Sequence, residues 1–259
     1  MKHTFIQGER DGTIIFIHGN SSSSKVFQHI LNSKNIRHSM LAVDLPGHGS
    51  SLNGYNREEN FFMGSYLDQL SDLIQSIDDD IVLVGNSLGG HIAIELAPRI
   101  ADKLLGLVVF GTPPLKKPLN FEEAFLPEPA LQTFFTENPP DNEIQEAANV
   151  AVFDEDKAPV IFTDFKNAHP KVRTALGVDV ANGRLLNEYE IFTGLPVSKY
   201  IIAGAQDPTV NGDYLNEVVK ASAGHCELIE FSDCGHYPSL ERPLQFEATL
   251  IRIANEVFK

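Results

Sequence analysis

Cysteine, long apolar runs and positive charge are all scarce in this 259-residue sequence. Its two cysteines, Cys226 and Cys234, are too few for a disulfide framework and are typical of reduced thiols in a cytosolic protein. No segment reaches the roughly 18 consecutive apolar residues that a membrane-spanning helix requires. Residues 1–11 also lack the apolar stretch of a secretory signal. We therefore expect a cytoplasmic protein that does not bind membranes.

The shortage of positive charge limits the kinds of partner that this protein can bind. Lys and Arg number 20 against 35 Asp and Glu, which gives a formal net charge of −15 at pH 7. Such a charge disfavours binding to nucleic acid. The nine histidines show no H-x-H or H-E-x-x-H spacing, and neither a G-x-G-x-x-G fingerprint nor a Walker lysine is present. We expect neither a metal nor a cofactor.

Six short apolar runs stand out in what remains. They cover residues 13–17, 39–43, 81–84, 104–110, 200–203 and 227–231. Short runs of this kind, apolar apart from Thr13, Ser39, Glu227 and Glu230, are typical of strands buried on both faces of a parallel sheet. Three other stretches carry apolar residues at helical spacing: residues 61–77, 89–100 and 243–258. The alternation predicts a doubly wound, mostly parallel α/β fold, in which ligands bind beyond the carboxyl ends of the strands.

Residues 115–194 interrupt this alternation because they contain no clear strand pattern. Three stretches within them favour helices: residues 121–137, 142–153 and 160–168. We predict a core formed by residues 1–114 and 195–259, with residues 115–194 inserted as a mostly helical lid. An independent second domain is the alternative, but the strand pattern resumes at Lys199, which favours the insertion.

A serine between two glycines lies where the third apolar run ends. The pentapeptide from Gly85 to Gly89 reads Gly-Asn-Ser-Leu-Gly, and it joins a predicted strand to a predicted helix. This is the G-x-S-x-G nucleophile elbow in its required strand–turn–helix context. The turn is so tight that a Cβ two residues before or after Ser87 would clash. We expect Ser87 to adopt a sparsely allowed backbone conformation that exposes its Oγ.

A serine hydroxyl needs a general base, and that base needs an anion to fix its tautomer. In this fold the partners follow in the order Ser, acid, His. His236 comes just past the apolar run 227–231, and Asp207 comes just past the run 200–203. We therefore predict a catalytic triad of Ser87, His236 and Asp207.

Other residues fit these roles less well. Asp213 is expected inside a helix, and Asp233 is close to His236 in sequence. Asp44 is expected to organise its own loop. The other candidate bases include His18, His48 and His91, which lie in other loops or in a helix. His169, in the predicted lid, and His225, before a strand, are expected at the surface.

Acyl transfer also requires donors for the oxyanion. The backbone N–H of Leu88 follows the nucleophile directly and is the first predicted donor. The second is the backbone N–H of Asn20, in the loop after the first apolar run, and the Asn20 side chain could add a contact. Ser21 and Ser22 are the alternatives for this second donor.

These motifs give the chain a strong resemblance to the α/β-hydrolase superfamily over nearly its whole length. The matching residues are His18-Gly19-Asn20, the run D-L-P-G-H-G-S at residues 44–50, the elbow, Asp207 and Gly235-His236. More narrowly, residues 18–23, 88–92 and 111–114 resemble the α/β-hydrolase-type N-acyl-homoserine lactonases. That group opens the lactone ring of quorum-sensing signals by Ser/His/acid chemistry without a metal. In that group the acid of the triad can be Glu, and the change to Asp207 in this chain preserves the role of that acid.

The triad and the resemblance imply a metal-free serine hydrolase that cleaves a small-molecule carboxylic ester or lactone through an acyl-enzyme on Ser87. Serine rather than aspartate at the elbow argues against the aspartyl-ester chemistry of dehalogenases and epoxide hydrolases. The alternatives are a general carboxylesterase, a thioester or carbon–carbon bond hydrolase, and a ligand sensor that keeps the triad but signals through lid movement. We expect a monomer or a homodimer.

Overall fold

A seven-stranded sheet forms the centre of the protein in a computed structural model that describes residues 1–55 and 57–258. The strand order is β1-β3-β2-β4-β5-β6-β7. The strands are β1 (Lys2–Ile6), β2 (Arg10–Ile17), β3 (His38–Asp44), β4 (Ile81–Asn86), β5 (Leu104–Phe110), β6 (Ser198–Gly204) and β7 (Cys226–Phe231). Every neighbouring pair is parallel except β1 and β3. The predicted doubly wound α/β fold is confirmed.

Strand β1 is present in the structure but is not among the six strands predicted from the sequence. It pairs antiparallel with β3 at the sheet edge, from Lys2 opposite Asp44 to Ile6 opposite Met40. Its side chains are largely exposed, so it has no need of the continuous apolar run that marks the buried strands.

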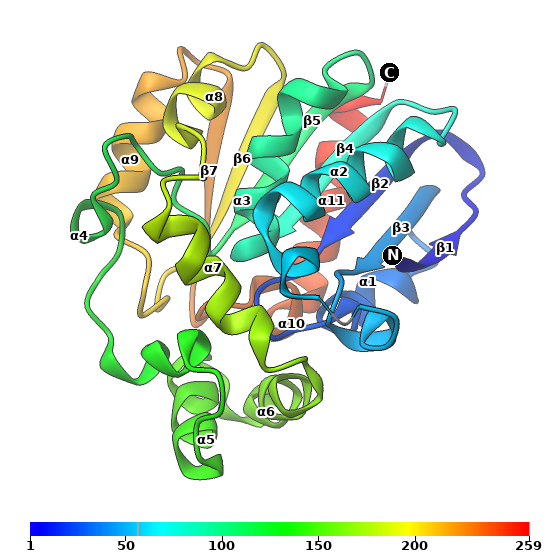
Figure 1. Ribbon diagram of the computed structural model, residues 1–259. Coiled ribbons are helices and arrows are strands. Elements are labelled where there is room, and N and C mark those ends of the chain that lie inside the picture. The colour runs from blue at the N-terminus through cyan, green and yellow to red at the C-terminus, as the bar shows by residue number, and fades with distance from the viewer. Residues whose placement is uncertain (56, 259) are drawn as a thin grey trace.

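Side chains alternate along each central strand and build two cores. Ile15 and Ile17 of β2 face one core, whereas Ile14 and Phe16 face the other. The first core is covered by α2 (Met63–Gln75), α3 (Leu88–Leu96) and α9 (Gly212–Ala221). The second is covered by η1 (Ser24–Phe27), α1 (Gln28–Leu31) and α11 (Pro243–Val257). Helices therefore pack on both faces of the sheet (Figure 1).

The three helices predicted for the core are present, with changes at their ends. A 3₁₀ turn, η3 (Glu58–Phe61), precedes α2. The helix predicted over residues 89–100 is α3 followed by the 3₁₀ turn η4 (Ala97–Ile100). Pro98 has no N–H to continue the α-helical hydrogen bonds, which accounts for the change of helix type. Two short elements complete the core: η2 (Gly49–Ser51) and α10 (Pro238–Glu241).

The chain reverses its direction of travel across the sheet between β2 and β4. From β2 it crosses to β3 on one side, and β4 then pairs with the other side of β2. Ligands of doubly wound folds bind at such a switch point, beyond the carboxyl ends of the strands. Here those ends lead into the loop that carries Asn20 and into Ser87.

The segment between β5 and β6 is mostly helical: its middle part lies beyond the end of the sheet to which the strand arrows point, whereas its last helix returns beside the sheet towards the opposite end (Figure 1). It contains α4 (Phe121–Ala124), η5 (Pro129–Phe135), α5 (Asp141–Val150), η6 (Glu155–Lys157), α6 (Ala158–Asn167), α7 (Lys171–Ala181) and α8 (Glu188–Gly194). The helices predicted over residues 142–153 and 160–168 are present as α5 and α6. The single helix predicted over residues 121–137 is wrong: α4 ends at Ala124, and Phe125 forms a bridge with Val210.

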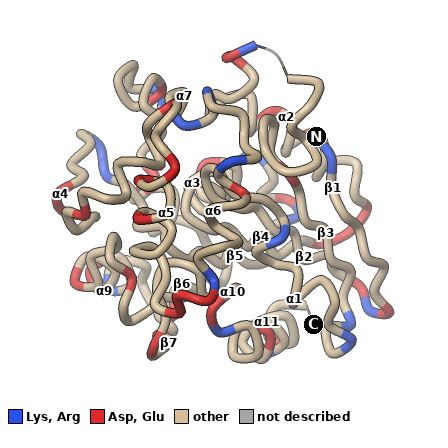
Figure 2. The backbone as a smooth tube through the Cα atoms, turned by 90° about the horizontal axis from the view of Figure 1, so that it is seen from below, with Lys and Arg blue, Asp and Glu red and all other residues tan. Residues whose placement is uncertain are grey.

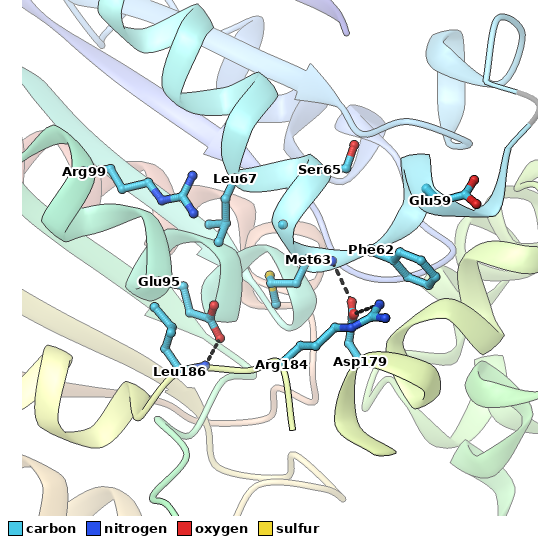
Figure 3. A pocket seen from close by; sticks show the side chains of 11 residues that line it. Glu59, Phe62, Met63, Ser65, Leu67, Glu95, Arg99, Asp179, Arg184 and Leu186 are labelled. Atoms are coloured by element: carbon cyan, nitrogen blue, oxygen red, sulfur yellow. Dashed lines mark hydrogen bonds and ion pairs between the residues drawn. The ribbon is translucent and has the colours of Figure 1, made fainter. Parts of the chain in front are cut away.

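Buried carboxylates attach this segment to the core. Asp179 of α7 accepts hydrogen bonds from Met63 N at 2.7 Å and from Arg184 Nη1 at 3.2 Å. Glu95 of α3 accepts one from Leu186 N at 2.8 Å, and burial raises the pKa of Glu95 to about 7. These residues surround a cavity of about 320 Å³ on the seam between the segment and the core (Figure 3).

Acidic residues are spread around the chain, from α4 and α9 to α11 and the strand β7, and not gathered on one element (Figure 2). Within residues 1–55 and 57–258, no helix combines the length and apolar character needed to cross a membrane.

Candidate active site

Ser87 occupies a strained corner between β4 and α3. Its φ is 51° and its ψ is −120°, a conformation that L-residues rarely adopt. Serine at the start of a helix usually caps the helix with its oxygen, but the Ser87 side chain makes no such bond. The hydroxyl is therefore not engaged by the helix end and is left available for chemistry.

Three glycines allow the elbow to pack this tightly. A Cβ on Gly85 would lie 2.4 Å from the Gly89 carbonyl oxygen, and one on Gly89 would lie 2.1 Å from the Ile17 carbonyl oxygen. At Gly90 a Cβ would meet Thr112 Oγ1 at 2.2 Å. The predicted crowding on both sides of Ser87 is confirmed.

Asp207 and His236 are brought together from two neighbouring loops. Asp207 follows β6, His236 follows β7, and His236 Nδ1 lies 2.8 Å from Asp207 Oδ2. The second carboxylate oxygen accepts bonds from Thr209 N at 2.9 Å and Thr209 Oγ1 at 2.6 Å. These contacts make Nδ1 the protonated nitrogen of a neutral His236 and leave Nε2 as the acceptor.

The electrostatic environment tunes both members of this pair. Burial opposes the charged form of His236, but the Asp207 carboxylate and, more weakly, Glu241 outweigh it and raise the pKa of His236. Burial likewise opposes ionisation of Asp207, but His236 and Thr209 outweigh it and lower the pKa of Asp207. His236 is therefore a stronger base than a free imidazole, supported by an ionised carboxylate.

The histidine ring and Ser87 both lie at the carboxyl end of β5. Ser87 N donates to Phe110 O at 2.9 Å, and a Cβ on the next residue, Gly111, would meet His236 Cε1 at 2.6 Å. Asn86 Nδ2 donates to His236 O at 3.3 Å, which ties the elbow to the histidine loop. The geometry gathers Ser87, His236 and Asp207 at one end of the sheet.

Two buried histidines organise the loop that carries Asn20. Leu45 N donates to His18 Nε2 at 3.0 Å, so the opposite nitrogen donates to Gly19 O. Ser21 N donates to His48 Nε2 at 3.0 Å. Burial lowers the pKa of His18, and burial together with His18 lowers that of His48 to about 3. Both rings are neutral supports for the loop.

The same loop lies directly against the elbow. A Cβ on Gly19 would be 3.2 Å from Ser87 Cβ, so the residue that follows Gly19 is next to the nucleophile. The Asn20 side chain, expected as a further oxyanion contact, instead donates from Nδ2 to Phe134 O at 2.8 Å. This leaves the backbone N–H as the group of Asn20 that is suited to an oxyanion.

The rival residues have other surroundings. Asp44 accepts bonds from Ser24 N and from the backbone and hydroxyl of Ser50, which agrees with a loop-organising role. Asp213 lies in α9, and Asp233 is exposed. His91 pairs with Glu188 of α8 at 2.7 Å.

Several site residues were not predicted. Thr209 could have been found from the sequence, because a residue two positions after an aspartate often donates to its side chain. Asn86 and Glu241 hold the His236 loop through contacts with residues distant in sequence or in another element. No local pattern reveals such contacts in advance.

The inserted segment contacts each of the three loops. Ala151 O accepts from His236 N at 2.9 Å, Leu126 N donates to Thr209 O at 2.7 Å, and Phe134 O accepts from Asn20. Among the described residues, no three His, Cys, Asp or Glu side chains are grouped to hold a metal ion.

Comparisons with known proteins agree with this fold. A model of the alpha/beta hydrolase family matches residues 14–249. The chain is 30% identical over 137 residues to a haloalkane dehalogenase of Mycolicibacterium smegmatis, covering 50% of this chain and 42% of that protein. It is 29% identical over 102 residues to 2-(acetamidomethylene)succinate hydrolase of Mesorhizobium japonicum, covering 39% and 36%. The chain thus spans less than half the length of these curated relatives.

Solved structures match over much more of the chain. The N-acyl homoserine lactonase AidH, solved with N-hexanoyl homoserine lactone, superposes with a TM-score of 0.87 at 25% identity, covering 98% of this chain and 93% of that one. An esterase from Exiguobacterium antarcticum superposes with a TM-score of 0.80 at 15% identity, covering 98% and 94%. The second likeness shows the shared fold alone.

Proposed function

The chain belongs to the α/β hydrolase family, and from that premise we propose that it is a metal-free serine hydrolase of carboxylic esters or lactones. The observation that carries the proposal is the 2.8 Å contact between Asp207 and His236 beside the strained Ser87 elbow. A nucleophile, a base with a raised pKa and an ionised acid are the parts that acyl transfer to serine requires.

The reaction proceeds in two halves. His236 Nε2 takes the proton of Ser87 Oγ as the oxygen attacks the substrate carbonyl, and the N–H groups of Leu88 and Asn20 stabilise the oxyanion. The proton then passes from Nε2 to the leaving oxygen, which gives the acyl-enzyme. Water, deprotonated by His236, releases the acid and restores Ser87. With a lactone, the leaving hydroxyl stays on the same molecule as the acyl group.

We propose an N-acyl-homoserine lactone as the substrate class. The support is the likeness to AidH, which extends over 98% of the chain and includes the inserted segment. In this proposal residues 115–194 act as the lid that shapes the acyl site. The contacts of Asn20, Thr209 and His236 with this segment make the lid part of the catalytic surroundings.

The mechanism and the substrate class are tested separately. Ser87→Ala should abolish hydrolysis of a p-nitrophenyl ester, whereas the same change at the exposed Ser76 should leave activity intact. Full activity in Ser87→Ala would contradict the mechanism. For the substrate, kcat/KM is compared between acyl-homoserine lactones and acyl esters of matched chain length. A wide preference for lactones supports the narrow proposal, and equal values would indicate a general carboxylesterase.

A further inference from the structure

Glu241 is a buried carboxylate at the end of α10 with an unusual set of partners. It is 3% exposed, and within the described residues no Lys, Arg or His side chain forms an ion pair with it. Five backbone contacts satisfy it instead. Oε1 accepts from Gly235 N and Tyr237 N, both at 3.1 Å. Oε2 accepts from Phe153 N at 2.7 Å, and from Asp154 N and Gly235 N at 3.1 Å.

These donors come from two segments that are far apart in sequence. One is the His236 loop after β7, and the other is the turn at residues 151–154 that follows α5 in the inserted segment. A buried anion without a cation must be stabilised by hydrogen-bond donors. The carboxylate therefore favours the arrangement in which both segments turn their N–H groups towards it.

Three successive backbone N–H groups around the histidine are fixed in this way. Gly235 N and Tyr237 N bind Glu241, and His236 N between them donates to Ala151 O at 2.9 Å. The approach is so close that a Cβ on Gly235 would lie 2.8 Å from Phe153 N. The backbone of the proposed base thus has little freedom to shift relative to the inserted segment.

We propose that Glu241 is a positioning residue for the reaction: its carboxylate joins the His236 loop to the turn at residues 151–154 and holds the imidazole in register with Ser87. The inference rests on the proposed function, because His236 is the base only in that mechanism. Glu241 touches neither substrate nor imidazole and acts through the backbone and through its charge.

The charge of Glu241 acts on the pKa of His236, and a residue with a purely structural role would have no such effect. The charged groups that act on the imidazole are Asp207, in the loop after β6, and Glu241 on α10, and both raise the pKa of His236. Removing the Glu241 charge should therefore lower the pKa of His236 and move the acid limb of the kcat/KM profile to lower pH.

The test compares Glu241→Gln with Glu247→Gln. Glu247 of α11 is a matched control, because it too is a buried carboxylate held by hydrogen bonds, from Ser33, Asn35 and His29, without contact to the His236 loop. Glutamine at 241 keeps the shape but presents an NH₂ group to backbone donors. In Glu241→Gln we expect kcat to fall by about 10²-fold with KM nearly unchanged. We also expect the acid limb of the kcat/KM profile to move to lower pH. Glu247→Gln should keep the kcat and the pH profile of the wild type.

Two further measurements keep the result interpretable. The imidazole of His236 is titrated by NMR in the full-length wild type and in Glu241→Gln, a readout that needs no turnover. If Glu241→Gln does not fold, Glu241→Asp is used, which keeps the charge but shortens its reach and should lower kcat with a smaller change in the imidazole titration. A variant that matches Glu247→Gln in kcat, pH profile and titration would overturn the inference. Activity that survives in Ser87→Ala would instead overturn the proposed function.

Discussion

At the scale of single residues, the pKa values of the buried histidines shift in opposite directions. The direction distinguishes the proposed base, His236, from the supporting residues His18 and His48. His18 and His48 are buried without a facing carboxylate strong enough to offset burial, so their pKa values fall and both stay neutral supports of the Asn20 loop. Burial acts on His236 in the same direction, but Asp207 at 2.8 Å outweighs it and raises the pKa of His236. A single nearby charge thus distinguishes the proposed base from structural histidines.

The pH dependence of activity follows from the direction of this shift. Only neutral His236 can accept the Ser87 proton, so activity is lost as the pH falls through the pKa of His236. Because that pKa is raised, the acid limb of kcat/KM should have its midpoint above the ordinary imidazole value of about 6.5. Initial rates across a buffer series at constant ionic strength measure this midpoint. A midpoint below 6 would be incompatible with the Asp207–His236 pair.

Asp207→Asn should change both the rate and the pH profile. An amide NH₂ facing Nδ1 favours the wrong imidazole tautomer, so kcat should fall by about 10³- to 10⁴-fold. With the carboxylate gone, burial lowers the pKa of His236, so the acid limb of the residual activity should move to lower pH. Asp213→Asn, an exposed change on α9, is the matched control. Equal rates in the two variants would remove Asp207 from the mechanism.

At the scale of elements, burial decides which parts of the fold can be predicted from the sequence. The largely buried strands β2 to β6 follow local apolar patterns and could be predicted. So could β7, which is more exposed but keeps the apolar residues Leu228, Ile229 and Phe231. The positions of Ser87, Asp207 and His236, just past β4, β6 and β7, could be predicted as well. The edge strand β1 could not, because its exposed side chains carry no apolar run. The break after α4 comes shortly before Pro127, which cannot join helical hydrogen bonds and is a local signal. The bridge between Phe125 and Val210 at the same place joins residues distant in sequence and could not be predicted.

Two glycine substitutions should have opposite effects on stability. Gly89→Ala drives a Cβ to 2.1 Å from the backbone oxygen of Ile17, and neither partner can move without opening the elbow. We expect a loss of more than about 3 kcal/mol of folding free energy, together with loss of activity. Gly177 lies inside α7 with no atom within 4 Å of its Cβ position, so Gly177→Ala should stabilise by about 0.5–1 kcal/mol. Urea unfolding measures both, and a stable, active Gly89→Ala would contradict the elbow geometry.

Arg173 of α7 joins the inserted segment to the Asn20 loop. It is 4% exposed, and its guanidinium donates to Thr136 O at 2.9 Å, to Glu137 O at 2.6 Å and to Ser21 Oγ at 3.3 Å. Arg173→Met should leave the buried Ser21 hydroxyl and the part-buried carbonyls of Thr136 and Glu137 without this donor, and should cost about 2–4 kcal/mol in denaturant unfolding. Arg252→Met removes half-exposed ion pairs with Glu227 and Glu256 and should cost less than about 1 kcal/mol. Equal losses would show that Arg173 does not hold the segment.

At the scale of the whole molecule, the sheet topology and the inserted segment together place the site. The chain reverses its direction across the sheet between β2 and β4, the point where doubly wound folds bind ligands, and the segment between β5 and β6 contacts the loops that carry Asn20, Thr209 and His236. The net charge of −15 disfavours polyanionic partners. The substrate class, the oligomeric state and the cellular compartment stay predictions.

The central claim is that Ser87 is the acyl-transfer nucleophile, and labelling tests it most directly. The wild-type protein is treated with a fluorophosphonate in the presence of EDTA, and peptide mapping by mass spectrometry is followed alongside residual ester hydrolysis. The account predicts one adduct per chain on Ser87, with activity lost in proportion to labelling. Hydrolysis that persists after complete modification of Ser87 would contradict it.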